Sequence, residues 1–325
     1  VTASNTPTCV SGGNFVYMAI RRPHKPPEAA TDVFAIDTYT GSFPNYISGF
    51  PVDFVINRDG INSGGDVTVF SRLLGTKRLK TNSTEAEANA FVAAEMDYSN
   101  GYGSGTGTSP DSEKYSWMFK RAPGFMDVVA YTGTGSATTI NHNLGAVPSV
   151  VLIKGRDTTY QWYWQHYALG ANTWLQLNNQ EAGAGNGDVF NSTLPTSSVF
   201  SVGSLAGSNG SGNTYIAYLF ADSPGISKAG TYTGTGSNIN VDCGFTAGAR
   251  FVLIKRTDTE ISGATGTNWY IWDTTRGIVS GNDPYLLLNR DNNGTDAQVT
   301  NTDYVDPLNA GFTVTASAPA ALNAS

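Results

Sequence analysis

The stretch that decides the fold is Tyr131-Thr132-Gly133-Thr134-Gly135-Ser136, which returns letter for letter as Tyr232-Thr233-Gly234-Thr235-Gly236-Ser237. The sequence after each copy repeats at the same offset of 101 residues, because Val151-Leu152-Ile153-Lys154 returns as Val252-Leu253-Ile254-Lys255. Self-similarity at a fixed spacing marks a repeat architecture. A period of about 100 residues is the size of a whole domain, so the sequence predicts tandem domains rather than a solenoid.

A more divergent copy precedes these two. Asp32-Val33-Phe34-Ala35 matches Asp127-Val128-Val129-Ala130, at a slightly different offset that loop insertions would explain. Each unit is closed by a segment that runs into a proline: Tyr17-Met18-Ala19-Ile20 before Pro23, Trp117-Met118-Phe119-Lys120 before Pro123, and Tyr218-Leu219-Phe220-Ala221 before Pro224. Because proline lacks an N–H group, strand pairing is expected to end there.

The repeats set the expected domain boundaries. Val1-Thr2-Ala3-Ser4 reappears as Val314-Thr315-Ala316-Ser317, so residues 1–31 are interpreted as the closing strand of a preceding repeat plus a proline-rich linker. The three repeats are then residues 32–125, 126–223 and 224–325, and the last is expected to lack its final strand. These matches suggest a piece of a longer array. Whether residues 14–20 complete the last repeat stays open.

Side-chain alternation predicts an all-β fold of tandem, jelly-roll-like β-sandwiches. In Gln161-Trp162-Tyr163-Trp164-Gln165, a period of two places Trp162 and Trp164 on one face of a strand and Tyr163 on the other. Many short strands separated by turn residues are typical of such sandwiches. One short helix is expected in the first unit, over Thr84–Met96, where Thr84 and Glu87 match a capping box and alanines follow.

Composition excludes several functional classes. Charged residues are only 14% of the chain, and the net charge is −7. Nucleic acid is therefore not expected as a partner, since duplex binding requires many cationic phosphate contacts. Apolar runs are far shorter than the roughly 20 residues needed to cross a bilayer, so no membrane insertion is expected. Cys9 and Cys243 lie in different units, which predicts free thiols rather than a disulfide framework or a zinc site.

No catalytic or metal-binding motif stands out in the chain. His24, His142 and His166 are scattered, and a turn or surface position is the favoured interpretation of His142. Asp59, Asp157 and Asp258 follow strands at equivalent places in the repeat, where turn capping explains their recurrence better than a catalytic pair repeated three times. We therefore expect no enzyme activity, no cofactor and no metal site.

The tryptophans are the one functional lead. Flat aromatic rings can stack on sugars, and Trp162, Trp164, Trp269 and Trp272 are weak candidates for glycan binding, with Trp174 a further possibility. The competing interpretation is core packing, because half of the aromatic residues in a strand point inward. The core interpretation is favoured.

These repeat motifs resemble the tandem β-rich repeats of tail fibre and related virion proteins of marine bacteriophages. The resemblance rests on Tyr17-Met18-Ala19-Ile20-Arg21-Arg22-Pro23, Ala122-Pro123-Gly124-Phe125 and Val252-Leu253-Ile254-Lys255-Arg256-Thr257-Asp258, and it spans nearly the whole chain. It implies a virion component of the tail, made in the bacterial host cytoplasm. It also implies a homo-oligomer, expected to be a trimer, that contacts other tail proteins and a host-surface glycan or protein.

The leading hypothesis is a structural and adhesive fibre segment without enzyme activity. A glycan-degrading tail depolymerase is the first alternative. A capsid decoration or passive spacer is the second. The family resemblance carries no catalytic residues onto this sequence.

Overall fold

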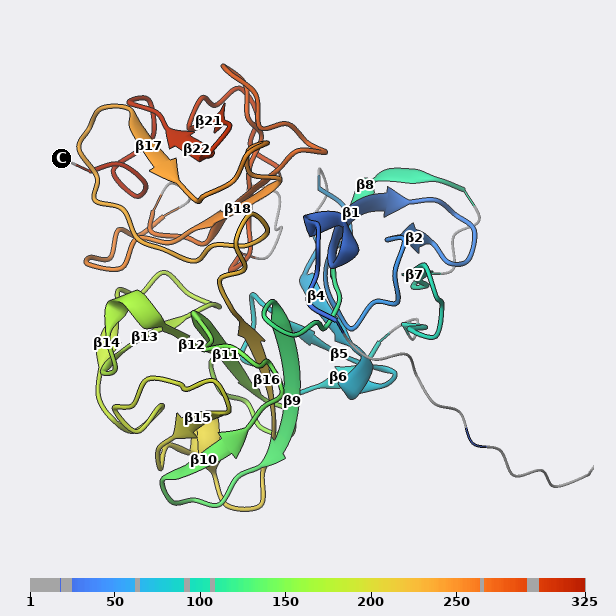
Figure 1. Cartoon of the computed structure of the whole chain (residues 1–325), viewed down its shortest axis with the longest axis vertical. Helices are drawn as coiled ribbons and strands as arrows, with labels where there is room; N and C mark the ends of the chain where they lie inside the picture. Colours follow the sequence, from blue (N-terminus) through green and yellow to red (C-terminus); the bar gives the residue numbers. More distant parts are fainter. Residues whose placement is uncertain are drawn as a thin grey trace, which may run out of the picture.

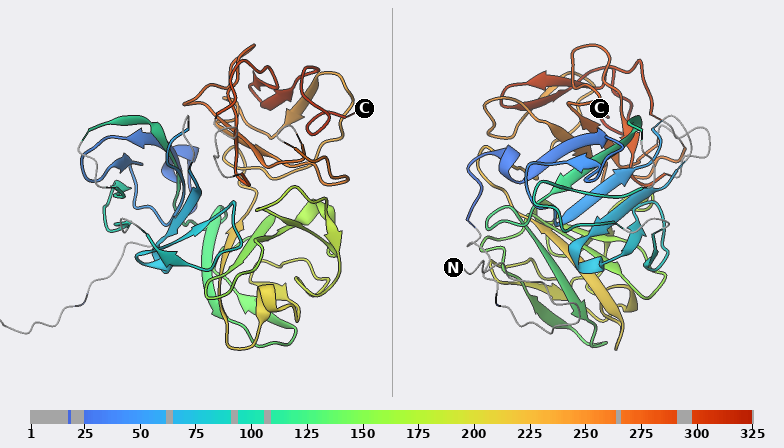
Figure 2. Two further views of the ribbon diagram at one scale, coloured as in Figure 1. Left: turned by 180° about the vertical axis from the view of Figure 1, so that it is seen from behind. Right: turned by 90° about the vertical axis from the view of Figure 1, so that its right-hand side faces the viewer.

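The computed structural model describes residue 18 and residues 25–61, 65–90, 94–105, 109–263, 266–290 and 298–324. Three lobes surround a common centre, running from blue through green and yellow to red along the chain (Figure 1). The same three lobes are seen from behind and from the side (Figure 2). Within the described residues, all strand pairs are antiparallel and the helical segments are short. The predicted all-β class is confirmed.

The first repeat forms one large sheet in the order β1-β8-β3-β4-β5-β6. The closing segment is β8, and it lies between β1 and β3. The strands are β1 (Phe34–Tyr39), β3 (Phe54–Arg58), β4 (Val67–Ser71), β5 (Lys77–Lys80), β6 (Ala88–Asn89) and β8 (Asp111–Phe119).

The second repeat has a sheet of the same design, in the order β14-β13-β12-β11-β16-β9. Its closing strand β16 lies between β11 and β9, as β8 does between β3 and β1. The strands are β9 (Met126–Thr132), β11 (Val150–Gly155), β12 (Tyr163–His166), β13 (Thr173–Gln176), β14 (Ala184–Gly185) and β16 (Thr214–Phe220).

The third repeat has the equivalents of the middle strands, β18 (Phe251–Ile254), β19 (Tyr270–Asp273) and β20 (Leu286–Leu287), paired in that order. In the described part of the chain, β18 pairs with β19 alone. No described strand lies on its outer edge, where β11 and β3 each carry a closing strand.

A second sheet covers one face of each of these sheets, which makes each repeat a two-layer sandwich. We call the first the large sheet and the second the small sheet of its repeat, although both have three strands in the third repeat. The small sheets are β2 (Tyr46–Ile47) with β7 (Gly101–Tyr102), β10 (Thr138–Asn141) with β15 (Val199–Val202), and β17 (Ile239–Asp242) with β22 (Gly311–Val314) and β21 (Val305–Leu308). Each sandwich encloses a hydrophobic cluster of its own, which we call its local core.

The other face of every large sheet points into one hydrophobic cluster shared by all three repeats, which we call the central core. In β16, for example, Ile216 and Tyr218 lie in the central core, whereas Tyr215, Ala217 and Leu219 lie in the local core. Strands that bury both faces need apolar residues at consecutive positions, which β11 and β16 have. The repeats are therefore not structurally independent domains.

The buried residues of the central core come from all three repeats. They are Val33, Phe34, Phe54, Ile56, Ile61, Val67, Val69, Leu74, Leu79, Tyr115, Trp117, Phe119, Ala122, Phe125, Met126, Val128, Leu152, Trp162, Leu175, Leu177, Ile216, Tyr218, Trp269, Ile271, Leu286 and Leu288.

Indole N–H groups join the repeats across this core. Trp162 Nε1 of the second repeat donates to Lys80 O of the first at 2.7 Å. Trp269 Nε1 of the third donates to Gln176 O of the second at 2.9 Å. Trp117 Nε1 of the first donates to Asp273 Oδ2 of the third at 3.1 Å. A buried indole needs such a partner, so these bonds fix how the repeats meet.

The predicted helix over Thr84–Met96 is wrong. Its described residues hold only the short strand β6 and extended backbone. Glu87 does not cap a helix but forms ion pairs with Lys77 at 3.0 Å and Arg156 of the second repeat at 2.7 Å. These ion pairs, one within the first repeat and one to the second, outweigh the weak helix propensity of the alanines. Among the described residues, a single α-helical turn, α1 (Ala206–Asn209), is found, and it lies in the second repeat.

Candidate functional site

The tryptophans proposed for glycan stacking are built into the cores. Trp162 and Trp272 have no exposed surface, and Trp269 is 2% exposed. Trp164 is partly buried, and its ring centroid lies 4.8 Å from that of Trp269. Trp174 packs edge-on against Tyr163 in the local core of the second repeat. The core interpretation accounts for these residues, and the buried rings offer no face to a sugar.

The repeated aspartates cap turns and pair with cations. Asp157 Oδ2 accepts from the N–H and the hydroxyl of Thr214 at 2.9 and 3.0 Å. Asp258 pairs with Arg256 at 2.7 Å, and this pairing lowers the pKa of Asp258. Asp59 pairs with Lys114 at 3.2 Å. These contacts are those of surface turns, and no two of the three carboxylates are joined in one site.

Strand register also corrects one equivalence. Arg58 lies opposite Tyr115 of its closing strand, as Lys154 lies opposite Ile216 of β16. The first repeat thus has Arg58 at the place of Lys154, which puts Asp59 at the place of Gly155 rather than of Asp157. Asp59 and Asp157 align in the sequence but not in strand register, because the loop after β3 differs in length from the loop after β11.

The described histidines act as turn residues. His142 lies in a turn as expected, but it is buried rather than at the surface. Its Nδ1 accepts from Leu144 N–H at 3.2 Å, which leaves Nε2 to donate to Thr196 O at 3.1 Å. His166 Nδ1 accepts from Ala168 N–H, and burial lowers the pKa of His166. His24 and Cys9 lie outside the described residues.

Metal-ligating residues do not gather anywhere in the described ranges, which hold no cluster of three or more His, Cys, Asp or Glu side chains. Cys243 is a free, partly buried thiol, and burial raises its pKa. No helix in the described part of the chain is long and apolar enough to span a membrane.

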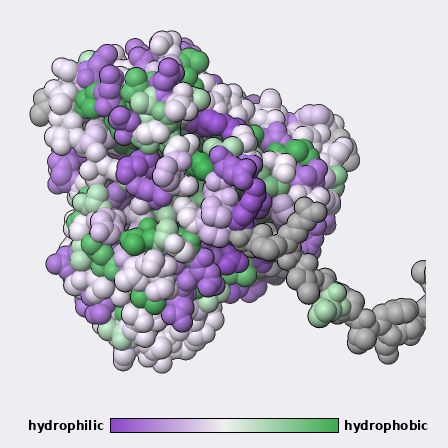
Figure 3. Space-filling view, viewed as in Figure 1, coloured by the Kyte–Doolittle hydropathy of each residue, from purple (hydrophilic) through white to green (hydrophobic). Residues whose placement is uncertain are grey.

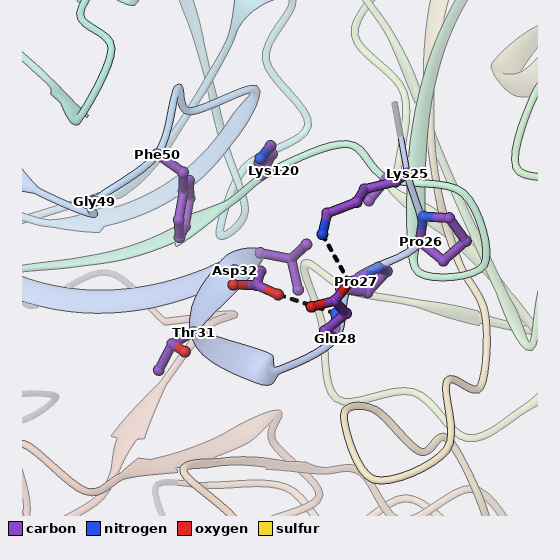
Figure 4. A pocket seen from close by; sticks show the side chains of 11 residues that line it. Lys25, Pro26, Pro27, Glu28, Thr31, Asp32, Gly49, Phe50 and Lys120 are labelled. Atoms are coloured by element: carbon purple, nitrogen blue, oxygen red, sulfur yellow. Dashed lines mark hydrogen bonds and ion pairs between the residues drawn. The ribbon is translucent and has the colours of Figure 1, made fainter. Parts of the chain in front are cut away.

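A shallow cavity of about 240 Å³ lies where the chain enters the first repeat (Figure 4). Lys25 and Glu28 on its rim pair with each other at 2.7 Å, and both are largely exposed. Asp32 accepts from the N–H groups of Glu28 and Ala29, which lowers its pKa. Because these charges are already satisfied by one another and by the turn, the cavity shows the features of a chain crossover rather than of a reactive site.

An aromatic pair of one exposed and one half-buried ring lies in the loops of the first repeat. Phe43 is 48% exposed, and its ring stacks on Tyr98 with centroids 6.5 Å apart and planes at 28°. Ile47 beside them in β2 is 43% exposed. We call Phe43, Ile47 and Tyr98 the aromatic tip. Elsewhere the face in Figure 3 shows apolar side chains in small patches among polar ones.

The aromatic tip is held rigidly from below. The pairing of β2 with β7 brings residues 43–47 beside residues 98–103. Buried Tyr46 and Tyr102 stack beneath the tip with ring centroids 4.9 Å apart. The Phe43 ring lies directly on the backbone of Gly103, where an added Cβ would come within 2.3 Å of the ring. A pre-organised aromatic surface loses little conformational entropy on binding a ligand.

Comparison with known proteins assigns the chain to a family. Residues 75–325 match the model described as "Domain of unknown function (DUF7483)". The chain belongs to this family. No curated protein and no solved structure matches it. The function of this DUF7483 chain must therefore be argued from its own surface.

Sequence reasoning missed the aromatic tip of this DUF7483 chain because it sought aromatics in alternating strands. Phe43 lies instead in Gly41-Ser42-Phe43-Pro44-Asn45, and Tyr98 in Asp97-Tyr98-Ser99-Asn100. Both segments consist of turn formers, which place their side chains at the surface. A large aromatic residue among turn residues was the signal that could have found the site.

Proposed function

We propose that this protein is a structural and adhesive segment of a bacteriophage tail fibre that contacts the host cell surface without enzyme activity. The repeat motifs that resemble virion repeats suggest this role. The rigid joining of three sandwiches around the central core supports it, since a fibre segment must transmit force without unfolding.

The observation that carries the adhesive part is the aromatic tip. Phe43 presents an exposed ring that stacks on the half-buried ring of Tyr98, and both are flanked by the exposed polar residues Ser42, Ser99 and Asn100. Aromatic rings pair with the C–H faces of saccharides, and neighbouring amides and hydroxyls supply hydrogen bonds that give orientation. The surface therefore fits a polysaccharide of the host envelope.

A polysaccharide array tests this proposal. The purified protein is applied to immobilised bacterial capsules and O-antigens, together with Phe43→Ala, Tyr98→Ala and the control Tyr167→Ala. Tyr167 is 50% exposed and belongs to the second repeat. Its substitution therefore removes an exposed aromatic ring at a place outside the aromatic tip. We expect both tip variants to lose at least about tenfold in affinity, as anchor aromatics do. Equal binding by all three variants would remove the tip from the proposal.

The depolymerase alternative is tested on the same glycans. A reducing-end assay on each bound polysaccharide should show no release of sugar by the protein. Release of sugar that disappears on substitution of a single Asp or Glu would contradict the proposed adhesive function and favour a depolymerase. Absence of binding to every glycan and to whole host cells would favour the passive spacer.

A further inference from the structure

The outer edge of β18 is built as an acceptor for one more strand. In the second repeat, β11 pairs with β12 on one side and with the closing strand β16 on the other. In the first repeat, β3 likewise pairs with β4 and with the closing strand β8. Within the described residues, β18 has the first kind of partner but not the second. An unpaired edge is a template for strand addition.

Side-chain burial shows what the open edge leaves uncovered. Phe251 and Leu253 are only partly buried, whereas Val150 and Leu152 at the same places in β11 are each 4% exposed. On the far side of the gap, residues 227–233 correspond to β9, yet they form no ladder with any described strand. We call β18 and residues 227–233 together the strand slot.

The sequence that fits the strand slot is found at residues 14–19. Phe15, Tyr17 and Ala19 correspond to Tyr115, Trp117 and Phe119, which point from β8 into the central core. Met18 corresponds to Met118 and Leu219, neither of which has any exposed surface. Met18 itself is 86% exposed. One chain thus combines a strand edge without a described closing strand and a donor sequence whose one described residue, Met18, is exposed.

We propose that the strand slot binds residues 14–19 of a second copy of this chain. The donor runs antiparallel to β18 with Tyr17 opposite Leu253, as Tyr218 lies opposite Leu152 in the second repeat. The occupant is a second copy because Met18 of the same chain lies outside the slot. This pairing uses backbone hydrogen bonds for affinity and alternate side-chain pockets for specificity.

Each copy then offers one donor and one acceptor on different surfaces. Such a heterologous contact adds copies head to tail, as an open chain or as a closed ring. The inference rests on the strand slot alone, and it holds whether or not the aromatic tip binds glycans.

Disulfide trapping between two singly substituted proteins tests the pairing. In a Cys9→Ser, Cys243→Ser background, one protein carries Tyr17→Cys and the other Leu253→Cys with a mass tag. The control partner carries Val279→Cys, a site that is 48% exposed and outside the slot. We expect the Tyr17→Cys and Leu253→Cys pair to form a mixed disulfide at least about tenfold faster than the control pair, because docking raises the effective concentration of the thiols. Equal rates would overturn the proposal.

A doubly substituted chain separates a second copy from the same chain. Tyr17→Cys with Leu253→Cys in one molecule should give a ladder of disulfide-linked oligomers, and an internally linked monomer would overturn the proposal. Sedimentation of the unsubstituted protein should show mass that grows with concentration. Met18→Asp should abolish this growth, while Met18→Leu should retain it. A monomer at all concentrations would contradict head-to-tail pairing.

Discussion

Asn209 and Asn323 make the same hydrogen bonds in two different repeats. Asn209 Oδ1 accepts from Thr134 N–H at 2.8 Å, and Asn323 Oδ1 accepts from Thr235 N–H at 2.9 Å. Their amide groups donate to Ser136 O at 2.7 Å and Ser237 O at 2.9 Å. The repeated Tyr-Thr-Gly-Thr-Gly-Ser stretches thus occupy matching environments, each tied to the end of its own repeat.

This asparagine clamp gives the first prediction. Asn209→Ala should lower the free energy of unfolding by about 3 kcal/mol, because it leaves Thr134 N–H, Ser136 O and Gly203 O without their hydrogen-bond partner. Asn323→Ala should act in the same direction. Urea denaturation measures both, with exposed Asn172→Ala as the matched control. A clamp variant that behaves like Asn172→Ala would contradict the assignment.

The joint between the first and third repeats gives the second prediction. Arg276 and Asp273 form a buried pair at 2.7 Å, with side chains 1% and 0% exposed, and Trp117 donates to the same carboxylate. Asp273→Asn leaves the guanidinium charge uncompensated and should cost about 3–5 kcal/mol. Trp117→Phe removes only a hydrogen bond and part of a ring, so its cost should be smaller.

The control for this joint is the exposed Arg256–Asp258 pair, where Asp258→Asn should change the stability by less than about 1 kcal/mol. Denaturant titration at one pH ranks the three variants by their free energy of unfolding. If Asp273→Asn ranks with Asp258→Asn, the buried pair does not hold the repeats together.

One buried and one partly buried lysine give a pH prediction. Lys154 Nζ donates to Thr84 O of the first repeat, and Lys255 Nζ donates to Gln180 O of the second, each at 3.0 Å. Burial lowers the pKa of each lysine to about 8, below the usual 10.5. Between these two values the unfolded chain keeps protons that the folded chain has lost, so stability rises with pH.

The measurement compares the protein with a Lys154→Met, Lys255→Met variant at pH 7.5 and 9.5. The unsubstituted protein should gain about 1–2 kcal/mol per lysine relative to the variant. Buried tyrosines lower the stability as the pH approaches 10, because burial raises the pKa of residues such as Tyr163 and Tyr285 to about 12 in the folded chain. This contribution cancels in the comparison, since the variant carries the same tyrosines. A difference that stays constant between the two pH values would show that the lysines titrate normally.

The sequence alone predicted the sheets and the repeat because both depend on local pattern. Alternation in Gln161-Trp162-Tyr163-Trp164-Gln165 correctly separates Trp162 from Tyr163, which lie in the central and local cores respectively. Alternation cannot show whether a strand face packs in the central core or in a local core, because apolar residues are required in both. The central core was therefore outside the reach of sequence reasoning.

The errors have the same origin in long-range contacts. Thr84–Met96 has the local pattern of a helix, but its described residues are extended and Glu87 N–H donates to Arg156 O of the second repeat. The glycan candidates Trp162, Trp269 and Trp272 were recognisable as aromatic, yet only the packing of the repeats shows that they are buried. The aromatic tip was missed because Phe43 meets Tyr98 only in the folded chain.

The central claim is that three repeats fold around one shared core, and scanning calorimetry tests it most directly. Trp162 and Trp269 reach from one repeat into the next, so the chain should melt in a single transition whose calorimetric and van't Hoff enthalpies agree. Trp162→Leu should shift that whole transition to lower temperature. Two or three separable transitions, of which Trp162→Leu shifts only one, would contradict a shared core.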